Sequence, residues 1–261
     1  MGNPDFLNFA KQIVAFLLAG GVVFLATWAM RLRPGSWKIE RPGKSAIVAL
    51  VVIVATLAAF AVYISIQNSG KPPSPTVLPV DLRFTASRFI RRMLLDGIFS
   101  VAPVLIVIRI RREPWSSTGV SSNNLWRSLA IGLPLCVLVL FSSGPSVIEG
   151  LQNLSIGHIW ALGLASLTGF GEEFLYRGYL QIRMMSWLGR WKGWVAASLV
   201  MALIHIMPRM LEQGMGPLDA LVSAATLIPV SLFLGFVMLR TGNIVASGML
   251  HTVAGWVTIL M

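Results

Sequence analysis

The sequence predicts an all-α polytopic membrane protein, a bundle of about eight transmembrane helices in a single integral membrane domain over residues 1–261. Of its 261 residues, 56% are hydrophobic and only 12% are charged, and the mean hydropathy is +0.76. A soluble domain carries about 25% charged residues. The composition therefore excludes an ordinary soluble protein, and the length accommodates eight spans of about 20 residues each.

Eight apolar stretches are the expected spans. They cover residues 6–30, 46–66, 93–110, 125–141, 157–182, 194–207, 218–239 and 243–261. Pro229 interrupts the seventh stretch, and the Pro-rich segment 68–79 predicts an extended connection. Residues 142–153 and 209–219 are expected to form loops on the external side.

Basic residues lie mostly at the ends of these stretches, and they orient the protein. Arg31–Lys44 holds five basic residues against one acid, and Arg109–Arg112 and Arg183–Lys192 are also basic. The positive-inside rule places these segments on the cytoplasmic side. The topology thus accounts for the net charge of +11. Because the sequence has no basic stripe with interleaved aromatic residues, we do not expect a nucleic-acid partner.

The segment Arg83–Arg92 contains four arginines alternating with apolar residues. This pattern predicts a short amphipathic helix at the membrane interface, leading into the third span. Asp96 lies four residues after Arg92, so we expect these two side chains to form a structural ion pair.

The stretch Gly169–Gly178 places two adjacent carboxylates and an arginine in an apolar span. Charged groups at this depth need partners or a water-filled cavity. In a helix, Glu173 and Arg177 are four residues apart and can pair, whereas Glu172 lies about 100° around the helix. We therefore expect Glu173 and Arg177 to form a structural pair that leaves Glu172 as the free, reactive carboxylate.

Two histidines occur at a depth similar to that of Glu172. Counted from the cytoplasmic ends of their spans, Glu172, His205 and His251 all lie roughly 12–18 Å into the membrane. The third histidine, His158, is expected at the outer interface. Because three separate spans place these groups at the same depth, we expect the groups to form a common site.

A glutamate and two histidines are compatible with two chemistries. Glu172 can act as a general base on a water that a histidine holds, or all three residues can ligate a divalent metal such as zinc. Because the sequence lacks a helical HExxH motif, we favour the mechanism without a metal and expect no cofactor. A serine elbow and a pair of deep aspartates are also absent, and the single Cys136 excludes an intrachain disulfide.

These residues resemble the motifs of the CPBP family, also called the ABI or CAAX protease-like family, which includes the Rce1-type prenyl-protein endopeptidases. Its EExxxR motif matches Glu172, Glu173 and Arg177, and its FxxxH and HxxxN motifs match His205 and His251. Met201 stands in place of the phenylalanine and Gly255 in place of the asparagine. The resemblance covers residues 157–261, the expected catalytic core.

The resemblance implies an intramembrane endopeptidase that cleaves a membrane-associated peptide or protein in a cytoplasm-facing cavity. Glu172 is implied as the general base, and His205 and His251 are implied to orient the water or the substrate carbonyl. In the family, the asparagine at the position of Gly255 is implied to stabilise the oxyanion. Asn243 is one candidate to replace that asparagine here. We expect the protein in the cytoplasmic (inner) membrane of a bacterium, and we do not expect prenylated substrates.

Two other functions remain open. Gly255 favours a catalytically weak or inactive family member that serves as a membrane scaffold or regulator. A small transporter using the buried charges as a proton relay would show repeat symmetry between its halves, and none is evident. The sequence does not define the oligomeric state.

Overall fold

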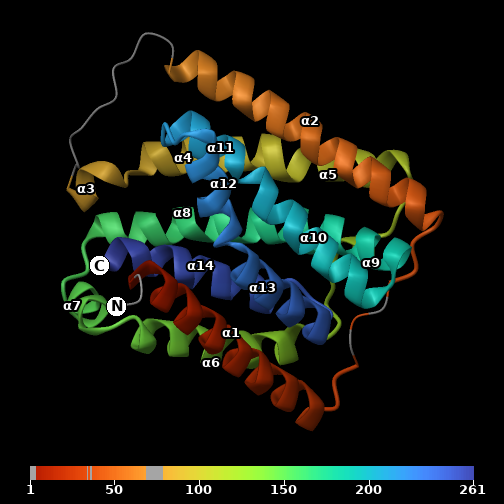
Figure 1. Cartoon of the computed structure of the whole chain (residues 1–261), viewed down its shortest axis with the longest axis horizontal. Helices are drawn as coiled ribbons and strands as arrows, with labels where there is room; N and C mark the ends of the chain where they lie inside the picture. The colour runs from red at the N-terminus through yellow and green to blue at the C-terminus, as the bar shows by residue number, and fades with distance from the viewer. Residues whose placement is uncertain (1–3, 34, 36, 69–78) are drawn as a thin grey trace.

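Helices make up almost all of the computed structural model, which describes residues 4–33, 35, 37–68 and 79–261, and no strand occurs in these ranges (Figure 1). The elements are α1 (Pro4–Ala29), α2 (Pro42–Asn68), α3 (Val80–Arg83), α4 (Ala86–Asp96), η1 (Gly97–Val101), α5 (Ala102–Ile110), η2 (Trp115–Thr118), α6 (Leu125–Ser142), α7 (Pro145–Gln152), α8 (Ile156–Glu172), η3 (Glu173–Gln181), α9 (Ile182–Leu188), α10 (Arg190–Ile204), α11 (Ile206–Glu212), α12 (Pro217–Ala225), α13 (Ile228–Thr241) and α14 (Val245–Leu260).

Among the described residues, six helical segments are long and apolar enough to cross a membrane. They are Phe9–Ala29, Pro42–Gln67, Ala86–Ile110, Leu125–Ser142, Arg190–Glu212 and Pro217–Thr241. A seventh arises if Pro145–Gln152 and Ile156–Leu188, which are bent by 118° from each other, form one span. The apolar helix Val245–Leu260 is shorter. All eight predicted stretches are therefore helical, and the all-α polytopic bundle is confirmed with six or seven candidate spans by length and composition.

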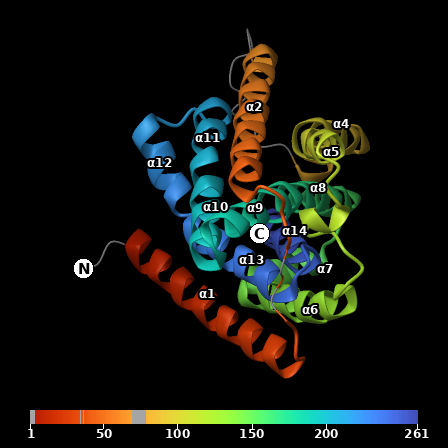
Figure 2. The same cartoon turned by 90° about the vertical axis from the view of Figure 1, so that its right-hand side faces the viewer.

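Helices α8 and α14 lie side by side at the centre of the bundle, with α6 against α14 and α4 against α8 (Figures 1 and 2). Glycines allow this central pair to approach closely. A Cβ atom on Gly169 would lie 2.9 Å from the backbone nitrogen of Thr252, and one on Gly248 would lie 2.7 Å from the ring of Phe170. This close contact brings the C-terminal end of α8 next to the middle of α14.

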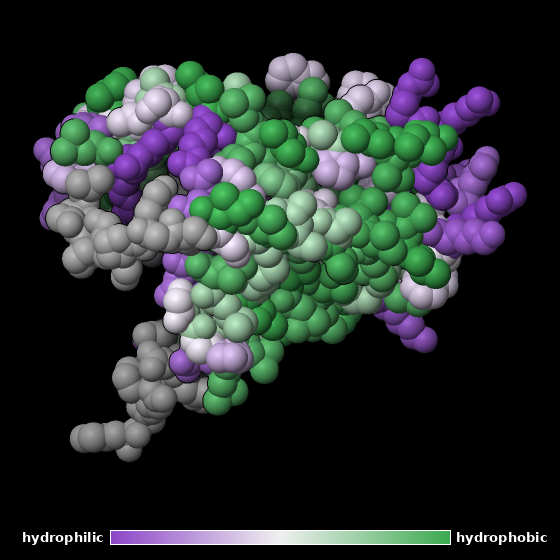
Figure 3. Space-filling model, turned by 90° about the horizontal axis from the view of Figure 1, so that it is seen from above, coloured by the Kyte–Doolittle hydropathy of each residue, from purple (hydrophilic) through white to green (hydrophobic). Residues whose placement is uncertain are grey.

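The outer faces of the bundle are apolar, as expected for helices that contact lipid. Leu17, Leu18 and Val51 are each more than 60% exposed. Figure 3 shows hydrophobic side chains over the middle of the molecule and hydrophilic side chains at its two ends. At one of these ends α1 and α13 finish and α2 and α10 begin, close to the segments that the sequence predicts to be cytoplasmic (Figure 1).

Three connections differ from the sequence-based expectation. Residues 145–152, expected in a loop, form helix α7, which starts at Pro145 in the first helical turn, where proline is favoured. The sixth span extends through α11 to Glu212, so Arg209 is helical and its Nε donates to Ser223 Oγ at 2.7 Å. The arginine-rich segment is divided between two helices: Arg83 ends α3, and the other three arginines lie on α4, which continues into the third span. The predicted extended connection 68–79 lies, for residues 69–78, outside the described residues.

Arg183 does not reach the interface as expected, because it is fully buried. Its guanidinium forms an ion pair with Glu113, donates to the Ser117 carbonyl at 3.1 Å, and lies 3.7 Å from the ring centre of Tyr179. Burial alone would raise the pKa of Glu113, but hydrogen bonds from Arg111 and Arg183, with their charges, hold that pKa below its ordinary value. This cluster joins α9 to the connection that follows α5.

Candidate active site

Glu172 is the last residue of α8, and the chain continues directly into the π-helical segment η3. All nine residues of η3 are buried, whereas the side chain of Glu172 keeps 23% of its surface exposed. Single π-helical segments within α-helices are rare and often occur at functional sites. Glu172 lines a cavity, whereas Glu173, which lies about 100° around the helix, faces the protein interior.

The structure brings Glu172, His205 and His251 together. The Nε2 atoms of His205 and His251 each lie 3.8 Å from the same carboxylate oxygen, Oε2 of Glu172. His205 is presented at the break between α10 and α11, and His251 comes from the middle of α14. At 3.8 Å neither contact is a direct hydrogen bond, so the carboxylate retains lone pairs for another donor.

The second nitrogen of each imidazole is held by a group that can only accept a hydrogen bond. Nδ1 of His205 lies 2.7 Å from the Met201 carbonyl oxygen, and Nδ1 of His251 lies 3.3 Å from Oε1 of Glu173. In the neutral imidazole, Nδ1 therefore carries the proton and Nε2 presents a lone pair toward Glu172. Met201, which takes the place of an aromatic residue in the motif, is buried in α10.

Glu173 and Arg177 are both fully buried and face each other, with 3.6 Å between Oε2 of Glu173 and Nε of Arg177. Glu173 thus contacts both an arginine and a histidine of the site. The sequence predicted the first contact, but it gave no signal for the second because His251 is 78 residues away along the chain. Through Glu173, the structural pair also orients one of the two imidazoles.

Gly255 lies one turn beyond His251 on α14, facing α8. A Cβ atom at this position would contact only the Cβ of Ala165, at 3.8 Å, so there is space for a side chain. Asn243 is not a replacement for the missing asparagine. It is buried, its Nδ2 donates to the Ser121 carbonyl at 2.6 Å, and its Oδ1 accepts from the Val245 backbone at 3.0 Å. Its hydrogen bonds hold the start of α14 instead.

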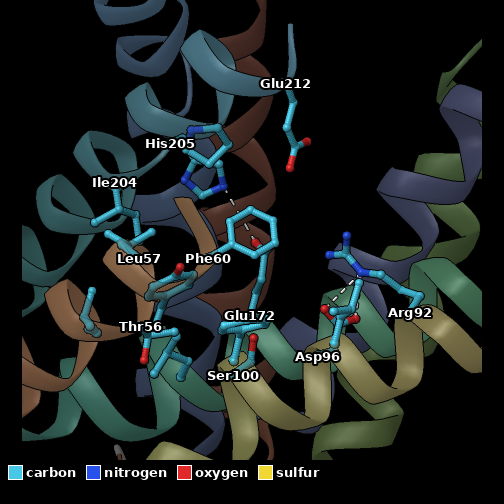
Figure 4. A pocket seen from close by; sticks show the side chains of 16 residues that line it. Thr56, Leu57, Phe60, Arg92, Asp96, Ser100, Glu172, Ile204, His205 and Glu212 are labelled. Atoms are coloured by element: carbon cyan, nitrogen blue, oxygen red, sulfur yellow. Dashed lines mark hydrogen bonds and ion pairs between the residues drawn. The ribbon is translucent and has the colours of Figure 1, made fainter. Parts of the chain in front are cut away.

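A cavity of about 190 Å³ contains Glu172 and His205 in its wall. In Figure 4 the Glu172 carboxylate points toward His205, and the paired Arg92 and Asp96 lie across the cavity from it. The expected ion pair of Arg92 and Asp96 is confirmed, with 2.9 Å between Nε and Oδ1. The sequence did not predict that this pair and Glu212 lie beside Glu172, because the pair is on α4, Glu212 is on α11 and Glu172 is on α8.

The cavity extends from Glu172 toward Glu212, at the end of the span that begins at Arg190. Arg190 lies among the basic segments, so these charged lining residues are on the side of Glu172 away from the expected cytoplasmic end. The cytoplasm-facing opening of the cavity stays a prediction. A second cavity of about 480 Å³ is mainly apolar and reaches Glu172, His205 and His251 from the side of α1, α6 and α13.

His158 lies at the opposite end of α8 from the site. Its Nδ1 accepts from the Ser155 backbone at 3.1 Å, and Asp81 accepts from Ser155 Oγ and from the Gly157 backbone. Hydrogen bonds from Ser155 and from Gly157 lower the pKa of Asp81. Within the described ranges, no group of three or more His, Cys, Asp or Glu side chains has a geometry suited to a metal ion.

Residues 154–257 match the family model described as Type II CAAX prenyl endopeptidase Rce1-like. This range contains Glu172, Glu173, Arg177 and both site histidines, and it omits α1 to α7. No curated protein and no solved structure matches the chain. The match supports a CAAX-type intramembrane protease kind of function. Residues 154–257 are therefore similar to the Rce1-like members of the CPBP, or CAAX protease-like, family.

Proposed function

We propose that this protein is an intramembrane endopeptidase that uses Glu172 to activate a water against a peptide bond of a membrane-associated substrate. One observation carries the proposal: the free carboxylate of Glu172 is faced by the Nε2 atoms of His205 and His251, each at 3.8 Å. The neighbouring carboxylate of Glu173 is buried against Arg177 and is therefore unavailable to a substrate.

The proposed reaction begins with a water between the Glu172 carboxylate and an imidazole. One water proton is directed at the carboxylate, and the other is directed at the lone pair of Nε2 on His205 or His251. Glu172 takes the first proton as the water oxygen attacks the carbonyl carbon. The tetrahedral intermediate then collapses, the C–N bond breaks, and Glu172 returns the proton to the leaving nitrogen.

The two cavities at Glu172 favour an extended peptide as the substrate. One cavity has Arg92, Asp96 and Glu212 in its wall, and the other is mainly apolar. A chain lying across Glu172 would thus place one flank among charged groups and the other among apolar side chains. This asymmetry is suited to a substrate that leaves the lipid phase near its cleavage site, in a bacterial cytoplasmic membrane.

The test uses the purified full chain in vesicles of phosphatidylethanolamine and phosphatidylglycerol, with pooled apolar peptides that carry a fluorophore and a quencher. Glu172→Gln should lower kcat by about 10²–10⁴, the contribution typical of a positioned general base. Glu149→Gln makes the same chemical change at an exposed position on α7 and should leave kcat unchanged. Cleavage by Glu172→Gln at the wild-type rate would contradict the mechanism.

The alternative is a scaffold that binds membrane partners without cleaving them, and Gly255 favours it because the position lacks the asparagine of the motif. A scaffold predicts no cleavage by the wild type. It also predicts that cells expressing Glu172→Gln keep any phenotype that depends on the protein. An intramembrane peptidase predicts that the same substitution removes both the cleavage and the phenotype.

A further inference from the structure

The attack of water on a carbonyl requires a hydrogen-bond donor for the oxygen that becomes negatively charged. In the proposed mechanism, both imidazoles present lone pairs at Nε2 and cannot serve as that donor in their neutral state. Gly255 has no side chain, and Asn243 is bonded elsewhere. The following inference rests on the proposed function and concerns which group fills this role.

Three residues with hydroxyl groups line the cavity at Glu172: Thr56, Ser100 and Tyr176. In Figure 4, Thr56 and Ser100 lie below the Glu172 carboxylate, on the side away from His205. Tyr176 packs next to His205: the two ring centres are 6.4 Å apart, with an angle of 52° between the rings. Of these three residues, Tyr176 is the one for which the structure records a contact with a histidine that faces the reactive carboxylate.

Tyr176 is four residues after Glu172, on the buried segment η3, and only 8% of its surface is exposed. Tyr176 and Glu172 line the same cavity. The structure records no hydrogen bond from its hydroxyl to another described residue. A tyrosine side chain has two rotatable bonds, so packing within η3 holds its hydroxyl in place at the cavity wall before a substrate binds.

We propose that the Tyr176 hydroxyl donates a hydrogen bond to the substrate carbonyl oxygen and stabilises the oxyanion of the tetrahedral intermediate. The phenol keeps its proton throughout: the proton of the attacking water goes to Glu172 and then to the leaving nitrogen. The donor is fixed in a buried, low-dielectric wall, where a hydrogen bond to a developing charge is strongest. Tyr176 thereby acts where Gly255 provides no donor.

The experiment compares Tyr176→Phe with wild type in the vesicle assay, using the peptide of the pool that wild type cleaves fastest. Removing one hydroxyl should lower kcat by about 10²–10³ and leave KM within a few fold, because the donor acts mainly in the transition state. Tyr179→Phe is the matched control. Tyr179 is on the same segment and fully buried, but its ring stacks on Arg183, away from the site. The kcat of Tyr179→Phe should therefore equal that of wild type.

The outcomes separate this inference from the proposed function. A wild-type kcat in Tyr176→Phe would overturn the role of Tyr176 while leaving the peptidase intact. A loss of kcat in Thr56→Val or Ser100→Ala, without one in Tyr176→Phe, would assign the donor to Thr56 or Ser100 and would also overturn the role of Tyr176. If wild type cleaves no peptide, the proposed function itself fails, and the inference fails with it.

Discussion

Removing the charge of Glu173 should destabilise the protein more than removing the charge of Glu172. Glu173 and Arg177 have no exposed side-chain surface, and no nitrogen of Arg177 has a hydrogen-bond partner in the described part of the chain. Glu173→Gln therefore leaves a buried guanidinium without its counter-charge, a loss that costs about 3–5 kcal/mol. Such a loss is a large part of a typical stability of about 5–15 kcal/mol.

The assay is unfolding of the purified protein in mild detergent, by heating and by titration with sodium dodecyl sulfate. Glu172→Gln should retain the stability of wild type, because its partly exposed carboxylate has no such partner. Arg177→Met should be as unstable as Glu173→Gln, and the double variant should be more stable than the sum of the two losses predicts. Equal stability of wild type and Glu173→Gln would refute the assignment of the pair as structural.

Three further predictions concern packing, pH and metal. Gly255→Ala should stabilise α14 by about 0.5–1 kcal/mol, because a Cβ atom at this position has space. Gly193→Ala should destabilise the protein, because its Cβ would overlap the backbone of α9. Changes of the opposite sign in detergent unfolding would contradict this prediction. Arg111 and Arg183 lower the pKa of Glu113 below its ordinary value of 4.5. The ionised Glu113 therefore stabilises the folded protein above pH 4.5, and this stabilisation is lost as the pH falls through the lowered pKa. Glu113→Gln should thus be less stable than wild type at neutral pH, with a gap that closes in acid; a constant gap would refute it. EDTA and phenanthroline should leave peptide cleavage unchanged, and activity that disappears and returns with one divalent ion would establish a metal mechanism.

Periodicity and charge allowed most of the fold to be predicted, because each span is a local feature of the chain. The break at Pro229 was predicted for the same reason: α12 ends at Ala225, and α13 starts at Ile228 with that proline in its first turn. The break at His205 has a comparable local cause: Pro208 has no backbone N–H to donate to the Ile204 carbonyl, and α10 ends at Ile204. Helix α7 was missed because a short segment without lysine or arginine, bounded by Gly144 and Asn153, resembles an external loop.

The candidate site was predictable to the extent that depth along a span can be counted. Counting placed Glu172, His205 and His251 at one level, and the structure brings them together. It could not give their angular positions, which depend on the π-helical segment η3 and on helix packing. Contacts between distant segments were therefore missed, notably Glu173 with His251 and the buried pair of Arg183 with Glu113.

The most direct test of the account follows the oxygen of the attacking water. In heavy-oxygen water, the vesicle assay should yield peptide products whose new terminal carboxyl carries one heavy oxygen atom. The folded Glu172→Gln variant should yield almost none over the same time. Labelled product formed by Glu172→Gln at the wild-type rate would contradict the central claim, because the carboxylate between His205 and His251 would then not be the base that activates the water.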